Sequence, residues 1–198
     1  MGIVKNQHYV PRFYLKYFAS SGDKIFCYDK IKKKVIETNV NNIANENYFY
    51  DLDKSFAENE GIEDIQYIEK QYSSIESSFA VYYSEFLVRL KSSTFKITES
   101  EREKIACYLS TQIERTKYHR EQSAQLYIAL KKKLNEWGVS DQHSLGYDAD
   151  VKSPKRIHTE NILFGDYLRD NVKEVIQRHI WMIFENNTNV PFFTSDNP

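Results

Sequence analysis

Apolar residues recur at helical spacing through the middle of the chain. From Ile65 to Leu90 they follow one another at steps of three or four, which places their side chains on one face of a helix. This face comprises Ile65, Ile68, Tyr72, Ile75, Phe79, Tyr82, Phe86 and Leu90. So many aromatic residues favour packing inside a helical domain over a two-stranded coiled coil. The pattern predicts one long amphipathic helix, and a homodimer formed through its aromatic face stays open.

A second long helix is predicted directly after the first. Thr98 and Glu101 have the spacing of a capping box, so we expect the helix to begin near Ser100. The apolar pattern continues, with or without a bend, as far as Gly138, whose tolerance of positive φ suits a helix end. We expect the buried stripe of this helix to consist of Ile105, Leu109, Ile113 and Thr116.

Both ends of the chain carry shorter runs that are typical of strands. Residues 24–29 and 35–38 flank a polar, lysine-rich stretch, which predicts a β-hairpin with Ile25 and Cys27 facing inward. Residues 179–198 predict a strand, a turn at 186–189 and a second strand. We expect strands from both ends to meet in one small, mainly antiparallel sheet.

The remaining segments complete the predicted fold. Pro11 can begin a short helix, because proline at the first helical position loses no hydrogen bond. Residues 161–177 return to helical spacing, and the polar residues 139–154 predict a loop. The fold class is therefore α+β, with a single domain over residues 1–198. Its parts are a β-rich region at 1–55, a helical region at 60–177 and C-terminal strands at 179–198.

Composition and charge restrict the partners of the protein. With 41% hydrophobic and 28% charged residues, the chain is not a disordered one. A net charge of -1 gives no global field to hold a polyanion or an acidic membrane, so any binding of nucleic acid must be local. The candidates for local binding are the basic runs 30–34 and 131–133, together with Arg115, Lys117 and Arg120. The alternative is that these residues form ordinary solvated faces.

The sequence also bears on compartment and cofactors. Nothing resembles a secretory signal, and no stretch approaches the ~18 apolar residues of a membrane-spanning helix, so we expect no membrane partner. Cys27 and Cys107 have neither zinc-site spacing nor the density of a disulfide scaffold, which predicts buried thiols in a reducing cytoplasm.

Several catalytic classes have no residues to support them. The chain contains no glycine-rich phosphate loop, HExxH motif, nucleophile elbow or CxxC motif, and we expect no organic cofactor. A divalent metal such as Mg²⁺ stays open, because Glu63, Glu69 and Asp196 could supply carboxylate ligands. Solvent-facing carboxylates on an amphipathic helix are the alternative.

Five short elements carry a recognisable family pattern. They are HYVPRFYL from His8, NYFY at 47–50, Gln112-x-x-Arg115-Thr116, a segment bearing Trp181, and PFFTSDNP at 191–198. Together they resemble the bacterial domain-of-unknown-function family numbered 4238 over essentially the whole chain. The resemblance implies no established activity, only that these positions belong together. Members of the family usually continue beyond SDNP, so it also implies that this chain lacks a further C-terminal portion.

The polar residues within these elements form a candidate site. His8 can act as an acid, a base or a ligand near neutral pH. Arg12 offers a planar fork to a phosphate or carboxylate. Gln112, Arg115 and His119 project from one side of the second helix, and Asp196 and Asn197 follow at the end of the last predicted strand. For the last two, a local turn stabilised by side chains is the alternative.

Two functional hypotheses follow from these residues. The first is a nuclease-like hydrolase acting on a phosphodiester or nucleotide. Its catalytic residues are His8 as general acid or base, Arg115 countering phosphate charge and Asp196 orienting the imidazole or holding a metal. Its substrate-binding residues are Arg12, Gln112 and Asn197. The second hypothesis is a non-catalytic binding or interaction module, in which the same residues form a buried polar network.

Overall fold

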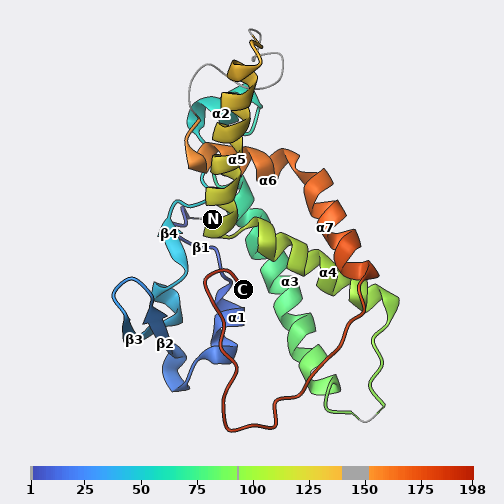
Figure 1. Cartoon of the computed structure of the whole chain (residues 1–198). Helices are drawn as coiled ribbons and strands as arrows, with labels where there is room; N and C mark the ends of the chain where they lie inside the picture. Colours follow the sequence, from blue (N-terminus) through green and yellow to red (C-terminus); the bar gives the residue numbers. More distant parts are fainter. Residues whose placement is uncertain (1, 93, 140–151) are drawn as a thin grey trace.

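A computed structural model describes residues 2–92, 94–139 and 152–198, with the backbone alone at 166–168. Within these ranges helices predominate, and two small antiparallel sheets lie toward the N-terminus (Figure 1). The long helix predicted from the central pattern is α3, Tyr67–Arg89. Its buried residues belong to the predicted face: Ile68, Tyr72, Phe79 and Phe86. In the described part of the chain, no helix is both long and apolar enough to cross a bilayer.

The second predicted helix is two helices, α4 (Glu99–Glu114) and α5 (Lys117–Glu136). The capping box of Thr98 and Glu101 at the start of α4 is confirmed. The helix breaks where Thr116 takes an extended backbone and accepts a hydrogen bond from the His119 amide at 3.2 Å. Thr116 thereby caps a new helix that leaves α4 in another direction (Figure 1). At its far end α5 stops before Gly138, which has a φ of 70°.

The predicted buried stripe of α4 is wrong in part. Thr116 is buried as expected, but Leu109 and Ile113 are 41% and 45% exposed. The face turned inward carries Thr111, Gln112 and other polar residues instead. Thr111 Oγ1 donates to the Cys107 carbonyl oxygen of its own helix, and Gln112 Nε2 donates to the backbone of Tyr9, which offsets part of the cost of burying these residues.

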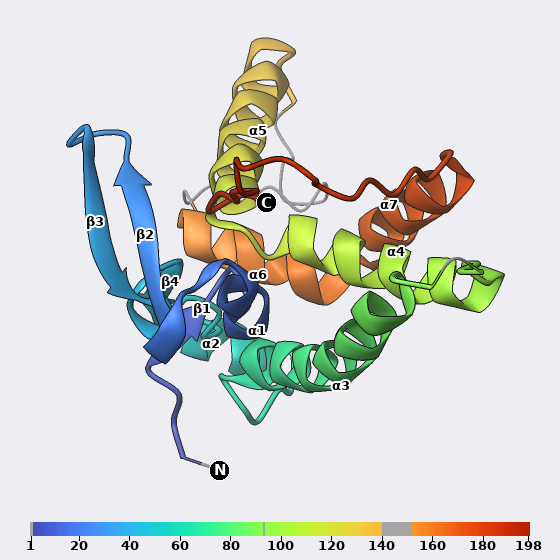
Figure 2. The ribbon, with the colours of Figure 1, turned by 90° about the horizontal axis from the view of Figure 1, so that it is seen from below.

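The helical segment near the C-terminus is also divided. Helices α6 (Pro154–Phe164) and α7 (Asp166–Arg178) meet at Gly165. A Cβ at Gly165 would lie 2.1 Å from the Asn161 carbonyl oxygen, so only glycine fits this junction. Helix α6 packs against α5, and α7 packs along α4 (Figures 1 and 2). Of the predicted loop 139–154, residues 140–151 lie outside the described residues.

The N-terminal region contains all the strands of the described chain. Strand β1 (Asn6–His8) pairs with β4 (Asn45–Asn47), so that His8 faces Asn45 across the ladder. The predicted hairpin is confirmed as β2 (Lys24–Asp29) and β3 (Lys34–Asn39). The shorter helices are α1 (Arg12–Leu15), which follows Pro11 as predicted, and α2 (Lys54–Asn59). Single 3₁₀ turns lie at η1 (Lys16–Phe18), η2 (Ser21–Asp23) and η3 (Val40–Asn42).

Two further predictions need correction. Cys27 is half-buried and Cys107 is exposed, so neither is a fully buried thiol.

The C-terminal strands do not form, although the α+β class is confirmed: residues 179–198 run as an irregular segment from α7 back to α1 (Figure 1). The turn at 186–189 is present, since Asn186 Oδ1 accepts a hydrogen bond from the Thr188 amide at 3.0 Å. Within the described chain, the flanking residues pair with no strand.

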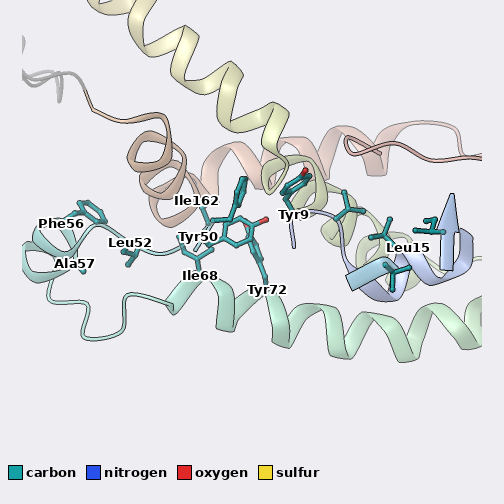
Figure 3. Close-up of a cluster of buried hydrophobic side chains, with 13 residues drawn as sticks. Tyr9, Leu15, Tyr50, Leu52, Phe56, Ala57, Ile68, Tyr72 and Ile162 are labelled. Carbon is teal, nitrogen blue, oxygen red and sulfur yellow. The ribbon is translucent and has the colours of Figure 1, made fainter. Parts of the chain in front are cut away.

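The hydrophobic core joins these elements around the segment 49–52. Phe49 and Tyr50 are almost fully buried and pack edge to face with ring centroids 4.7 Å apart. Tyr50 also packs edge to face on Tyr72 of α3 at 5.0 Å, and Ile162 of α6 belongs to the same cluster (Figure 3). Aromatic pairs of this geometry add to the stabilisation from burial alone. The core therefore fixes β1 and α1 against α3, beside the candidate site.

Candidate functional site

The strand β1 presents its residues alternately to the interior and to a pocket. Gln7 is fully buried: its Nε2 donates to Asp51 Oδ1 at 2.5 Å, and its Oε1 accepts from the Tyr50 amide at 2.6 Å. Because side chains alternate along a strand, His8 points the other way. The bonds of Gln7 thus hold β1 in the register that turns the imidazole of His8 toward the pocket.

The imidazole of His8 is neutral at physiological pH. Its Nε2 lies 3.3 Å from the Val40 carbonyl oxygen and 3.3 Å from Asn45 Nδ2. Burial lowers the pKa of His8 to about 4, and the positive charges of Arg12 and Arg115 act in the same direction. When Nε2 donates its proton to the Val40 carbonyl, Nδ1 keeps the lone pair that can accept another proton.

A polar pocket of about 340 Å³ opens beside His8. Arg12 is exposed at this pocket, and its Nη1 donates to Asn41 Oδ1 at 3.2 Å. The strand β1, the turn η3 and the helix α3 each contribute to the wall. The lining residues are Val4, Asn6, His8, Arg12, Asn41, Glu69, Ser73 and Glu76.

Arg115 lies behind the wall of the pocket and is only 2% exposed. Its Nη1 forms an ion pair with Glu76 Oε1 at 2.6 Å, and its Nη2 donates to the carbonyl oxygen of His8 at 2.5 Å. Its guanidinium also lies 4.8 Å from the ring centroid of Tyr72. Burial lowers the pKa of Arg115, but Tyr50 and Glu76 outweigh burial and raise it, so the group stays charged. Arg115 therefore positions the pocket rather than lining it.

Gln112 binds the backbone directly after the end of β1. Its Nε2 donates to the carbonyl oxygen of Tyr9 at 3.1 Å, and its side chain is buried. The hydroxyl of Tyr50 donates to the carbonyl oxygen of Arg115 at 2.8 Å and closes the network. These contacts are those of the buried polar network considered above for Gln112 and Arg115.

The acidic groups at the pocket are Glu69 and Glu76 of α3. Burial raises the pKa of Glu69 to about 7; Arg115 opposes this shift, while Glu76 adds to it. The sequence pattern had marked Glu69 as a metal ligand only, and it missed Glu76. The two lie seven residues apart, two helical turns along one face, which is the one sequence feature that could have grouped them.

The structure does not gather a metal site from the predicted carboxylates. Among the described residues, no three His, Cys, Asp or Glu side chains are arranged to hold a metal ion. Glu63 is exposed ahead of α3, and neither Glu63 nor Asp196 lines the pocket with Glu69.

Asp196 and Asn197 do not line the pocket beside His8. Both are exposed, and Asp196 forms no hydrogen bond or ion pair with the described residues. Ser195 Oγ donates to the Asn197 carbonyl oxygen at 2.7 Å, which is the local turn considered as the alternative. The segment is tied to α1 by a hydrogen bond of 3.2 Å between the hydroxyls of Thr194 and Tyr14. Asp196 acts electrostatically on Tyr9, whose pKa is raised by burial first and then by this carboxylate.

Comparison with known proteins places the sequence in a family. The sequence model of one family, described as "Protein of unknown function (DUF4238)", matches residues 6–198. The chain belongs to this family. No curated protein and no solved structure matches it.

In this DUF4238 chain, the elements that carried the resemblance interlock. Gln112 and Arg115 bind the backbone carbonyls of Tyr9 and His8, and Tyr50 of the NYFY element binds the backbone of Arg115. Much of the pattern therefore serves to hold the N-terminal strand against α4. His8 and Arg12 are the members of this pattern that reach the pocket.

Proposed function

We propose that the pocket beside His8 is the acid–base site of a hydrolase acting on a phosphodiester or nucleotide. The observation that carries this proposal is the combination of Glu69, His8 and an exposed Arg12 around one open cavity. Two of these groups have pKa values moved from their ordinary range in opposite directions, to about 7 and about 4. Titratable groups pushed apart in this way inside one cleft are typical of acid–base sites.

The proposed roles differ from those predicted from the sequence. Glu69 in its carboxylic acid form donates a proton to the leaving oxygen as the phosphorus–oxygen ester bond breaks. The neutral imidazole of His8 accepts a proton from the attacking water, and Arg12 neutralises charge on the phosphate oxygens. Arg115 does not contact the substrate and acts as a positioning residue, because it binds Glu76 and the backbone of His8.

The test is a hydrolysis assay with matched variants. Wild-type protein is incubated with bis(p-nitrophenyl) phosphate and with labelled RNA and DNA, in EDTA and in Mg²⁺. We expect turnover that falls at least about hundredfold in Glu69→Gln, because the proton donor is lost. Glu85→Gln, an exposed glutamate on the same helix, is the control and should retain full activity. Equal rates in the two variants, or no turnover of any substrate by wild type, would refute the proposal.

The pH profile supplies a second test of the same roles. The rate should fall as pH rises above about 7, where Glu69 loses the proton it donates. It should also fall as pH drops toward about 4, where His8 becomes protonated and can no longer accept one. A profile without a decline near pH 7 contradicts the role of Glu69.

A binding module without catalysis is the second candidate. It is favoured by the burial of Arg115 and Gln112, which bind the backbone of His8 and Tyr9 and do not line the pocket. In that case the pocket would bind a small anion such as a nucleotide without cleaving it. Calorimetry showing saturable nucleotide binding, with no product after prolonged incubation, would favour this candidate over the hydrolase.

The proposed compartment is the cytoplasm. Cys27 and Cys107 are both free in the described chain, and neither is placed to require an oxidising environment.

A further inference from the structure

The β2–β3 hairpin presents a surface that the pocket does not use. It stands apart from the helices at one side of the molecule (Figure 2). On one face of the hairpin Ile25 is buried against the core, and Cys27 is half-buried. The opposite face looks into solvent. A two-stranded ribbon anchored near Ile25 is thus free to offer its other face to a partner.

The solvent face of the hairpin carries aromatic rings. Phe26 and Tyr28 are two residues apart on the same strand and are 63% and 61% exposed. Across the ladder, Tyr28 pairs with Val35, which is 66% exposed, and Phe26 pairs with Glu37. Large apolar side chains left this open on a fixed ribbon are costly in water and are common at binding surfaces.

The turn of the hairpin is strongly basic. Between residues 24 and 39 there are five lysines and two acidic residues, in a chain whose net charge is -1. Asp29 Oδ1 accepts hydrogen bonds from the amides of Ile31 at 3.0 Å and Lys32 at 2.9 Å, which fixes the turn. The lysines of the turn are all exposed, and Lys30 and Lys33 form no ion pair with the described residues.

We propose that this face of the hairpin binds single-stranded nucleic acid. Exposed rings on a sheet surface stack on unpaired bases, and lysines beside them neutralise phosphates. The step between Phe26 and Tyr28 is about 7 Å along the strand, which leaves room for a base at each ring. The inference concerns binding alone and goes beyond the proposed hydrolysis, which it does not require.

An anionic membrane fits the same surface less well. The rings lie along the flank of the strand, behind the turn, whereas the outermost residues are the lysines around Ile31. A bilayer would receive the tip first and would leave the rings outside its apolar layer. A polynucleotide laid along the flank contacts the rings and lysines together.

The test measures the binding of labelled 20-nucleotide RNA and DNA single strands by fluorescence anisotropy between 50 and 200 mM salt. Phe26→Ala/Tyr28→Ala should weaken binding at least about tenfold, because both stacking surfaces are lost. Lys30→Gln/Lys32→Gln/Lys33→Gln should reduce the slope of log affinity against log salt by about 2, since each phosphate contact to a single strand adds about 0.7. The two strands show whether RNA or DNA is preferred.

Matched controls separate this surface from other basic residues and from the pocket. The triple change of Lys131, Lys132 and Lys133 to Gln removes the same charge from α5 and should leave the affinity within twofold. The hairpin variants should hydrolyse bis(p-nitrophenyl) phosphate at the wild-type rate, because none of their residues lines the pocket, so a failure of hydrolysis and a failure of the hairpin surface are distinguishable.

Three results would overturn the inference. They are no binding at 50 mM salt, equal losses from the hairpin and α5 lysine variants, and binding to anionic vesicles but not to either oligonucleotide. If the double aromatic variant fails to fold, the salt dependence of binding by the lysine variant still tests the inference.

Discussion

Arg115 shows how a single residue can combine features of a structural and a catalytic group. It is charged, nearly inaccessible to water, and bonded to a carboxylate from α3 and to a carbonyl from β1. A buried charge is tolerated only when every neighbour compensates it, so such a residue is coupled to the packing around it. Its role is to keep His8 and Glu76 at the wall of the pocket.

Replacement of Arg115 by alanine should therefore destabilise the protein strongly. The change leaves Glu76 and the His8 carbonyl without a partner, and we expect a loss of about 3 kcal/mol in the free energy of unfolding. Urea denaturation measures it. Arg178→Ala, which breaks an exposed ion pair with Glu174, should cost about 0.5 kcal/mol or less. An Arg115→Ala variant as stable as wild type would contradict the network.

His158 makes a residue-scale prediction about acid. It is fully buried, and its Nε2–H donates to the Glu114 carbonyl oxygen at 2.9 Å. Burial lowers the pKa of His158 to about 4, below its ordinary 6.5, so the unfolded chain binds the proton more readily. The stability that this shift supplies is present above pH 6.5 and is lost as pH falls toward 4.

The measurement compares wild type with His158→Gln by urea unfolding at several pH values. Between pH 7 and pH 4, the difference in unfolding free energy should shift against wild type by on the order of 3 kcal/mol. A difference that stays constant over this range would show that His158 does not titrate as its burial requires.

At the scale of elements, the sequence predicted the features that depend on neighbouring residues and missed those that depend on distant ones. The capping box of Thr98 and Glu101 needs only neighbours in sequence, so the start of α4 could be predicted. The inward turn of Gln112 and Arg115 depends on carbonyls 103 and 107 residues away, and periodicity alone places Ile113 inside instead. The sequence did not group Glu69 and Glu76 with His8, because the pocket joins residues that are distant in sequence.

The same distinction holds for the strands: the hairpin between neighbouring segments was predicted correctly, and the C-terminal strands were not. The two runs at 24–29 and 35–38 pair with each other across a short turn, so the sequence contains both partners of the hairpin. For residues 179–198 the apolar pattern suits a strand, but a strand forms only where another offers its edge. The backbone of that region meets side chains instead: Arg102 Nη2 donates to the His179 carbonyl oxygen at 2.9 Å.

The junction of α6 and α7 gives a test at this scale. Gly165→Ala should cost about 3 kcal/mol of stability, because the new Cβ would meet the Asn161 carbonyl oxygen at 2.1 Å and the backbone would have to shift. The control is Gly138→Ala, which meets no atom within 4 Å and carries only the strain of a φ of 70°, about 1 kcal/mol. Thermal and urea unfolding of both variants measure the difference, and equal losses would contradict the close approach at Gly165.

At the scale of the whole molecule, the neighbouring residues His8 and Tyr9 face different polar groups. His8 looks toward the pocket on α3, whereas Tyr9 is the residue on which the charge of Asp196 acts. The sequence grouped His8 and Asp196 in one site, because nothing in the motifs tells which side of the segment each one reaches. In the folded chain His8 lines the pocket and Asp196 does not.

Asp196→Asn tests that separation directly. Because Asp196 is absent from the lining of the pocket, we expect its replacement to leave hydrolysis of bis(p-nitrophenyl) phosphate within twofold of wild type. Glu69→Gln assayed beside it provides the contrasting loss. A hundredfold decrease in Asp196→Asn would restore the catalytic role predicted from the sequence.

The clamp on β1 has a consequence for the order in which the molecule is made. Every side chain that lines the pocket belongs to the first 76 residues, yet the guanidinium that secures the backbone beneath His8 is at position 115. A ribosome that has released the first hundred residues has thus produced the whole lining and the bonds of Gln7, but not the guanidinium of Arg115 that secures the His8 carbonyl. Contacts this distant in sequence form only after both partners exist, so the pocket acquires its shape late in synthesis.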